Sequence, residues 1–210
     1  LPVSSTGHLI LVNEFVSLSP QSFSNSFNVI IQLGAILSVV VIYFEKLNPF
    51  SSKKTDNQKK NTINLWLKVI VGVIPAGVLG FLFDDYIDKY LFGPVTVTIA
   101  LFVWGLIIIW IENKNKKMSI DSVYKITFKT AFIIGLIQCL AMIPGTSRSA
   151  ATIIGAMLLG CSRGAAAEFS FFLAIPTMFG ATLLKLAKML LSGTAFTSWQ
   201  WLLLGLGCVF

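Results

Sequence analysis

The chain has 210 residues, of which 55% are hydrophobic and only 12% are charged, and its mean hydropathy is +0.81. A soluble domain carries about 25% charged residues, so a water-soluble enzyme of this size could not cover its surface with so few. The 12% of aromatic residues and the long apolar runs also exclude a disordered or fibrous chain. We therefore predict an all-α integral membrane protein, a polytopic helical bundle that forms a single membrane domain over residues 1–210.

The chain order of apolar runs predicts the membrane-spanning helices. A spanning helix needs roughly 17–25 apolar residues, and the runs at 27–44, 65–83 and 91–111 meet this length. A further run begins at Trp199 and continues to Phe210. We therefore expect three full crossings in the first half of the chain and the beginning of another at its end.

The net charge of +7 arises from 16 Lys and Arg against 9 Asp and Glu. The lysines cluster in two short segments between apolar runs, at 45–64 and 112–129, where membrane topology explains them without nucleic acid. Such segments lie on the cytoplasmic side, which places the acidic segment 84–90 and residues 1–26 outside. We expect the membrane as a partner and no nucleic acid.

Two shorter apolar arms, at 131–143 and 150–161, flank the polar sequence Pro-Gly-Thr-Ser-Arg-Ser at 144–149. Each arm has about a dozen residues, too few for a comfortable crossing. An unpaired guanidinium at membrane depth costs several kcal/mol. Two short arms around a polar bend therefore predict a re-entrant helix hairpin that lines a cavity.

A weak internal repeat links the two ends of the chain. Residues 2–8 resemble 144–149, and the Gln-Leu-Gly-Ala sequence at 32–35 resembles Met-Phe-Gly-Ala at 178–181. An odd number of membrane crossings separates the two similar parts of the chain. This predicts inverted-topology repeats, whose two re-entrant hairpins meet near the membrane midplane. The predicted repeats cover about 1–83 and about 131–210, with 84–130 connecting them.

Arg148 is the polar residue that most needs an explanation. A guanidinium binds phosphate oxygens in a bidentate manner, and hydroxyls with the N–H groups of a helix N-terminus add further donors. The alternative is an ion pair with Glu168, the one carboxylate that we expect inside the membrane. We favour a phosphate site. The residues expected to bind it with Arg148 are Gly145, Thr146, Ser147, Ser149 and Thr152.

His8 is the only histidine, and it follows a run of hydroxyls beside an apolar arm. A histidine exchanges protons near neutral pH, although a lone histidine is often structural. Ser5 lies three residues earlier, on the same face of a helical turn. Ser4 and Ser5 either cap this helix or include a nucleophile that His8 activates. We expect Ser4 and Thr6 to contact the substrate.

Residues 1–8 and 144–152 resemble the two signature motifs of the undecaprenyl-diphosphatase family, also called bacitracin-resistance proteins. The likeness extends to 31–37, 74–76 and 167–171. It implies a hydrolase of the bacterial plasma membrane that converts undecaprenyl diphosphate to undecaprenyl phosphate. Such an enzyme recycles the lipid carrier of peptidoglycan synthesis, shapes the cell wall and confers resistance to the antibiotic bacitracin.

The resemblance also implies site roles and a cofactor. Ser5, His8 and Arg148 become the catalytic candidates, and either Ser5 or His8 is the nucleophile. The family uses a divalent cation, Mg²⁺ or Ca²⁺, and has an acidic motif directly before the sequence with which this chain starts. We therefore expect the chain to be part of a longer protein. Its metal ligands are unknown from this sequence. Three roles stay open for Glu168: it binds the metal, orients Arg148 or caps a helix.

Three further expectations concern the environment of the site. The cavity is expected to open to the outside, where spent diphosphate carrier appears. A homodimer is kept as an alternative to a monomer. A transporter or flippase of a lipid phosphate is the alternative function, because inverted repeats with broken helices are typical of transporters.

Overall fold

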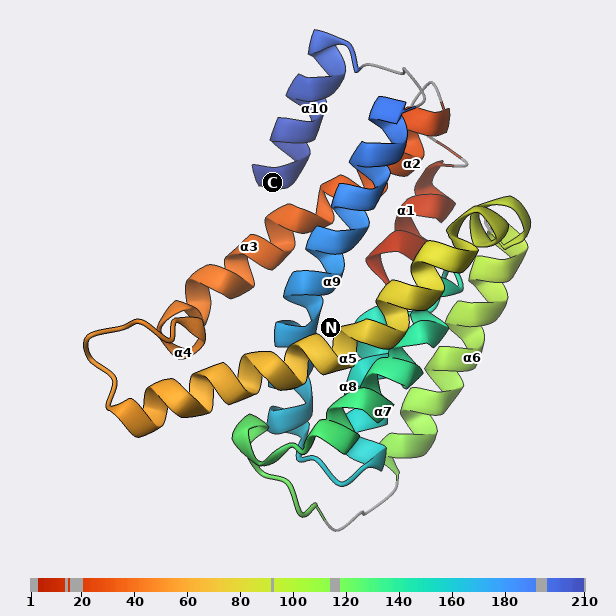
Figure 1. Cartoon of the computed structure of the whole chain (residues 1–210). Coiled ribbons are helices and arrows are strands. Elements are labelled where there is room, and N and C mark those ends of the chain that lie inside the picture. The colour runs from red at the N-terminus through yellow and green to blue at the C-terminus, as the bar shows by residue number, and fades with distance from the viewer. Residues whose placement is uncertain are drawn as a thin grey trace.

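The computed structural model describes residues 4–13, 15, 21–91, 93–113, 118–191 and 196–209. Every regular element in these ranges is a helix, and their only bridge is an isolated one between Ile120 and Cys161 (Figure 1). This confirms the predicted all-α class. The elements are α1 (Ser5–Asn13), α2 (Gln21–Ile30), α3 (Gln32–Ile42), α4 (Phe44–Leu47), α5 (Asp56–Tyr90), α6 (Pro94–Glu112), η1 (Val123–Lys125), α7 (Phe128–Gln138), η2 (Cys139–Met142), α8 (Arg148–Leu158), α9 (Arg163–Leu191) and α10 (Ser198–Val209).

Three of the described helices contain apolar stretches long enough to cross a membrane. These stretches are Asp56–Phe83 in α5, Pro94–Ile111 in α6 and Arg163–Lys188 in α9. The first two confirm the spans predicted at 65–83 and 91–111. The third lies within the second predicted repeat, about 131–210.

The sequence-based boundaries are wrong at two places. The run predicted as one span at 27–44 is interrupted at Ile31, between α2 and α3, and again at Tyr43. Near the first break, a Cβ added to Gly34 would lie 2.0 Å from the carbonyl oxygen of Cys208, so α10 packs directly on this backbone. The segment 84–90, expected as an acidic loop, is the last part of α5. Between Gly80 and Gly93 the sequence has no Gly or Pro, so no such residue ends the helix within 84–90.

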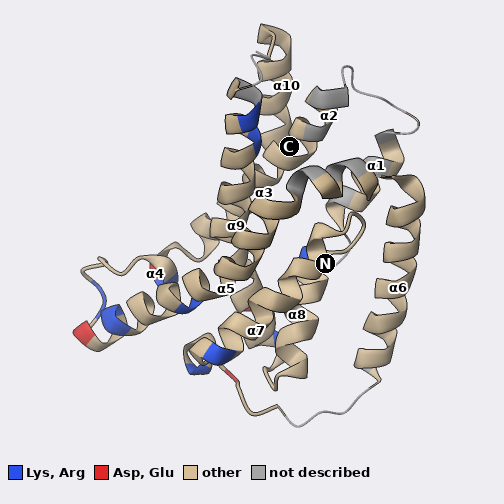
Figure 2. Ribbon diagram, turned by 45° about the vertical axis from the view of Figure 1, so that its right-hand side comes forward, with Lys and Arg blue, Asp and Glu red and all other residues tan. Residues whose placement is uncertain are grey.

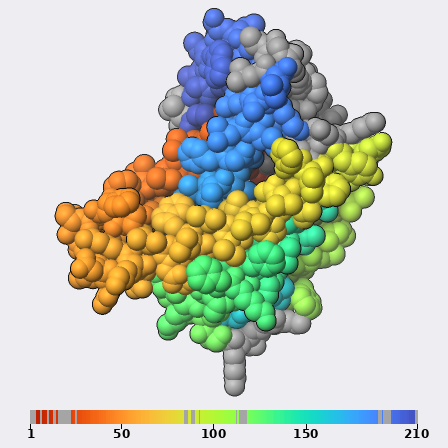
Figure 3. All heavy atoms as spheres, in the orientation of Figure 1, coloured from red at the N-terminus to blue at the C-terminus, as the bar shows by residue number. Residues whose placement is uncertain are grey.

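Helix α5 crosses the other helices obliquely, and in the space-filling view it lies between α9 and α7 (Figures 1 and 3). Its N-terminus carries a capping box, in which Thr55 and Gln58 satisfy each other's backbone N–H groups. It meets α7 at Gly72 and Gly135, where a Cβ on Gly135 would lie 2.1 Å from the carbonyl oxygen of Gly72. Small residues allow such close approach of helix backbones in membrane proteins.

The two arms predicted around residues 144–149 form a helical hairpin of α7, η2 and α8, and its re-entrant placement in the membrane stays a prediction. Its open end is closed by backbone hydrogen bonds, since the N–H groups of Ser119 and Ile120 both donate to the carbonyl of Gly160 at 3.0 Å. The N–H of Ser162 donates back to Ile120 at 2.7 Å. Both arms therefore begin and end at the same side of the bundle. The main core lies beside them, where α9 contributes the fully buried Phe169, Phe172 and Leu173.

Lys and Arg gather around α4, the start of α5 and the segment before α7, with a second group on α9 towards α10 (Figure 2). The two lysine-rich segments meet at Tyr124. The ammonium of Lys46 lies 5.5 Å from its ring centroid, and the ammonium of Lys68 donates to its carbonyl at 2.9 Å. Both segments therefore lie at the same end of the molecule, as the positive-inside rule requires. Residues 1–3 of the polar run predicted as the first bend lie outside the described residues, and the two inverted repeats remain a prediction.

Candidate active site

The structure brings the two polar motifs of the sequence into contact. A Cβ added to Gly7 would lie 3.2 Å from the Cα of Gly145 and 3.4 Å from Cγ1 of Val97. Gly145 has a φ of +90°, and a Cβ there would lie 2.7 Å from both the Cα and the carbonyl oxygen of Val97. The start of α1, the bend before α8 and the first turns of α6 are therefore packed backbone to backbone. Only glycine fits at Gly145, because it has both a left-handed φ and no room for a side chain.

The first motif forms the beginning of α1. Ser4 is buried and has a φ of 44°, a left-handed conformation that is strained for a residue other than glycine. Its hydroxyl oxygen accepts a hydrogen bond from the N–H of Gly7 at 3.3 Å, as a helix cap does. The expected structural role of Ser4 as a cap is thus present. A strained polar residue at this position fits the substrate-contacting role equally.

His8 is held by the same residue. Its Nδ1 lies 2.9 Å from the carbonyl oxygen of Ser4, and because a carbonyl only accepts, Nδ1 must carry the proton. A neutral His8 therefore keeps its lone pair on Nε2, where it can accept a proton. The side chains of His8 and Ser5 are exposed on α1. The side chain of Thr6 lies outside the described part of the structure.

The second motif forms the bend and the N-terminus of α8. The hydroxyl of Thr146 accepts a hydrogen bond from the indole N–H of Trp104 at 3.1 Å. Ser147 caps the helix, since its hydroxyl oxygen accepts from the N–H of Ala150 at 3.2 Å, and it lies 3.1 Å from the hydroxyl of Ser149. One hydrogen bond between these two serines uses one O–H and leaves the other for a ligand.

Arg148 is the first residue of α8. Its Nη1 is buried and has no hydrogen-bond partner among the described residues. A buried guanidinium donor without a partner is costly, so this atom calls for an acceptor beyond the described residues. The alternative pairing with Glu168 is wrong, because the carboxylate of Glu168 binds the ammonium of Lys46 instead. The arrangement at the helix N-terminus favours an anion.

The depth of Arg148 follows from the length of its helix. Helix α8 ends at Leu158, beside the closed base of the hairpin at the lysine-rich end. At a rise of 1.5 Å per residue, Arg148 lies at most about 15 Å beyond Leu158. The hydrocarbon core of a bilayer is about 30 Å thick, so this distance suits a site near its middle.

Thr152 is placed differently from the other expected phosphate-binding residues. It is fully buried, and its hydroxyl lies 2.9 Å from the carbonyl of Arg148 and 2.5 Å from the hydroxyl of Ser170. This side chain therefore fixes the first turn of α8 against α9. Its contribution to the site is to hold the backbone of Arg148 in place.

Several residues near the motifs were not found from the sequence. Trp104 sits in an apolar run that reads as lipid-facing, and Ser170 lies in another, so neither carried a local signal. Gln138 ends α7 and is buried, and both its amide atoms have no partner among the described residues. Gln138 could have been noticed, because it is the single polar residue in the apolar arm that leads to the bend.

The described part of the chain does not provide a set of ligands for a divalent cation. No group of three or more His, Cys, Asp or Glu there could hold a metal ion. Glu168, the one carboxylate considered as a ligand, is engaged by Lys46. The residues present therefore do not fit the cation on their own, and we derive no step through it.

The comparisons with known proteins extend over the whole chain. A family model described as bacitracin resistance protein BacA matches residues 1–210. The chain is 58% identical over 210 residues to undecaprenyl-diphosphatase 1 of Clostridioides difficile, covering 100% of this chain and 76% of that protein. It is 56% identical over 215 residues to the undecaprenyl-diphosphatase of Fusobacterium nucleatum (99% and 79% covered). It is 52% identical over 212 residues to that of Enterococcus faecalis (100% and 77% covered).

Proposed function

Because this chain belongs to the bacitracin resistance protein BacA family, we propose that it hydrolyses undecaprenyl diphosphate to undecaprenyl phosphate and inorganic phosphate. It is a multi-pass membrane protein, and the proposed activity recycles the lipid carrier of peptidoglycan synthesis. The names of its relatives are those of diphosphatases and give no support to the transporter alternative.

The observation that carries this proposal is the buried Nη1 of Arg148, near the junction of the two motifs, which has no hydrogen-bond partner in the part of the chain that the structure describes. A diphosphate would supply acceptor oxygens for this guanidinium. The N-terminus of α8 and the O–H left over from the Ser147–Ser149 pair point to the same ligand. Together these groups would stabilise the charge that develops on the transferred phosphoryl group.

The proton chemistry falls to His8. With Nδ1–H donated to the carbonyl of Ser4, Nε2 can accept the proton of the attacking oxygen, which belongs to Ser5 or to a water molecule. The oxygen between the two phosphorus atoms leaves with the prenyl phosphate. Trapping a phosphoserine at Ser5 would assign the attack to Ser5. Full activity of Ser5→Ala would instead assign it to water or to His8.

The test is phosphate release from a long-chain prenyl diphosphate by the natural full-length protein in detergent. We expect Arg148→Ala to lower the rate by about 100-fold or more, as loss of a single charge-stabilising donor does elsewhere. Arg163→Ala at the exposed start of α9 is the matched control and should keep the rate. No release by folded wild type with either Mg²⁺ or Ca²⁺, and without any membrane gradient, would refute the proposal in favour of transport.

The cellular setting is part of the same proposal. We place the protein in the bacterial plasma membrane with its cavity open to the outside. The contact of both lysine-rich segments at Tyr124 supports a common cytoplasmic side for them. Labelling of Ser17→Cys in intact cells, after replacement of the native cysteines, tests this orientation. Labelling only after permeabilisation would reverse it.

The cofactor and the assembly state complete the proposal. A divalent cation, Mg²⁺ or Ca²⁺, would neutralise charge on the diphosphate. This part of the proposal rests on family resemblance alone. Phosphate release with and without a chelator measures this requirement. A homodimer is likewise proposed from resemblance, and the mass of the detergent complex tests it.

A further inference from the structure

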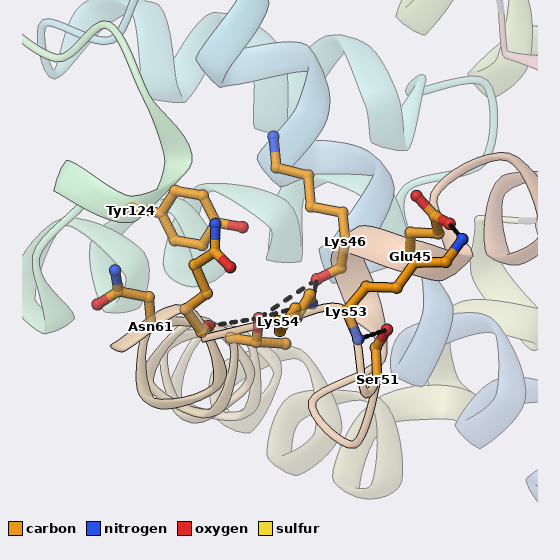
Figure 4. A pocket seen from close by; sticks show the side chains of 9 residues that line it. Glu45, Lys46, Ser51, Lys53, Lys54, Asn61 and Tyr124 are labelled. Atoms are coloured by element: carbon orange, nitrogen blue, oxygen red, sulfur yellow. Dashed lines mark hydrogen bonds and ion pairs between the residues drawn. The ribbon is translucent and has the colours of Figure 1, made fainter. Parts of the chain in front are cut away.

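A second polar site lies at the lysine-rich end of the molecule, apart from the two motifs. It is a pocket of about 430 Å³ between α4, the segment after it, the first turns of α5 and Tyr124. Figure 4 shows Glu45 and Lys53 on one side, Tyr124 and Asn61 on the other, and Lys46 and Lys54 between them. None of these residues belongs to the proposed active site.

The charges of this pocket favour an anion. Three lysines and one glutamate line it, which gives the lining a net charge of +2. The ammonium of Lys54 is fixed by three acceptors, the carbonyls of Lys46 (3.0 Å) and Asn48 (2.8 Å) and the hydroxyl of Thr62 (2.9 Å). Burial lowers the pKa of Lys54, although nearby Glu45 acts in the opposite direction. An anion in the pocket would compensate this partly dehydrated cation.

Two of the lysines keep donors for a ligand. Lys53 pairs with Glu45 at 3.1 Å, and Lys46 pairs with Glu168, so each engages one carboxylate. An ammonium has three N–H donors. The remaining donors, together with the amide of Asn61 and the phenol of Tyr124, match the several oxygens of a phosphate group.

The surroundings of the pocket indicate a lipid as the source of that phosphate. The exposed apolar side chains of Ile42 and Phe44 at the end of α3 and in α4 lie next to it along the chain, and Phe50 precedes the lining residue Ser51. The indole N–H of Trp66 donates to the carbonyl of Leu47 at 2.9 Å, and tryptophan is typical of the membrane interface. An anion with apolar chains suits this combination better than a free ion.

We propose that this pocket binds the phosphate group of an anionic phospholipid from the lysine-rich leaflet. Basic pockets between membrane helices on the cytoplasmic side bind such headgroups in other proteins. The site is separate from catalysis and is independent of the proposed phosphatase activity.

The experiment is native mass spectrometry of the protein in detergent, titrated with phosphatidylglycerol or with phosphatidylcholine. All variants carry Arg148→Ala, so that the proposed active site does not contribute. We expect phosphatidylglycerol to bind more tightly than phosphatidylcholine, and Lys53→Gln to weaken it about fivefold, the effect of one lysine near an anionic surface. Lys60→Gln, an equal change of charge outside the lining, should leave it unchanged.

A change of opposite sign separates binding from a structural role. Glu45→Gln removes the carboxylate that holds Lys53 and should strengthen phosphatidylglycerol binding. Equal binding of the two lipids, or equal loss in Lys53→Gln and Lys60→Gln, would overturn the proposal. Binding of inorganic phosphate at least as tight as that of phosphatidylglycerol would overturn the lipid as the source and assign the pocket to free phosphate.

Discussion

The crossing of α5 and α7 at Gly72 and Gly135 makes a sharp prediction for Gly135→Ala. The added Cβ would lie 2.1 Å from the carbonyl oxygen of Gly72 and 2.8 Å from its carbon, whereas ordinary contact begins at 3.4 Å. The two helices must therefore separate by about 1.3 Å, and a packed interior does not absorb such a shift without loss. Overpacking of this kind costs about 1–3 kcal/mol. In a chain of this size that lowers Tm by about 2–12 °C.

The measurement is thermal unfolding in detergent, with Gly77→Ala as the matched control. Gly77 lies on α5 just beyond the crossing, and a Cβ there meets nothing within 4 Å. Removing this glycine should leave Tm unchanged or raise it, because alanine stabilises a helix by about 1 kcal/mol relative to glycine. A Tm for Gly135→Ala equal to that of Gly77→Ala would refute the view that the close crossing holds the hairpin.

The remaining predictions concern single polar contacts. Thr152→Val should lose about 1–3 kcal/mol of stability, because it leaves the hydroxyl of Ser170 buried without its partner, and adding Ser170→Ala should cost less than the sum of the two single changes. Glu168→Gln should keep the rate of phosphate release within about threefold of wild type, and it should lower Tm by a few degrees because the pair with Lys46 is lost. A collapse of the rate in folded protein would show that this carboxylate serves the reaction. Ser4→Ala should destabilise by about 1 kcal/mol through loss of the cap, whereas Ser4→Gly, which relieves the left-handed φ, should cost less; equal unfolding midpoints for the two would contradict the strain at this residue.

The parts of this structure that depend on local pattern could be predicted from the sequence. The lengths of the apolar runs predict α5 and α6, and the two short arms around Pro-Gly-Thr-Ser-Arg-Ser predict the hairpin. The break at Ile31 could not be predicted. It lies beside a close contact with the backbone of α10, made by residues far along the chain.

The same distinction holds for the site. The hydroxyls around Arg148 are visible as a motif, because they are neighbours in sequence. The pairing of Glu168 with Lys46 joins residues 122 positions apart, and the contact of Thr152 with Ser170 depends on how α8 meets α9. No periodic pattern in the sequence indicates which distant residues form such pairs. Sequence reasoning therefore offered Arg148 as a partner for Glu168, although the fold pairs that carboxylate with Lys46 of α4.

The backbone packing at Gly7 and Gly145 has a consequence for inhibitors of this protein. A side chain at Gly145 would overlap the backbone of Val97, and one at Gly7 would come within 3.2 Å of the Cα of Gly145. Gly145 has no room for a side chain, and one at Gly7 would require its neighbours to move by a few tenths of an ångström. A compound that gained its affinity from the main chain of this junction would face a surface that single point mutations cannot reshape without dismantling the fold around it.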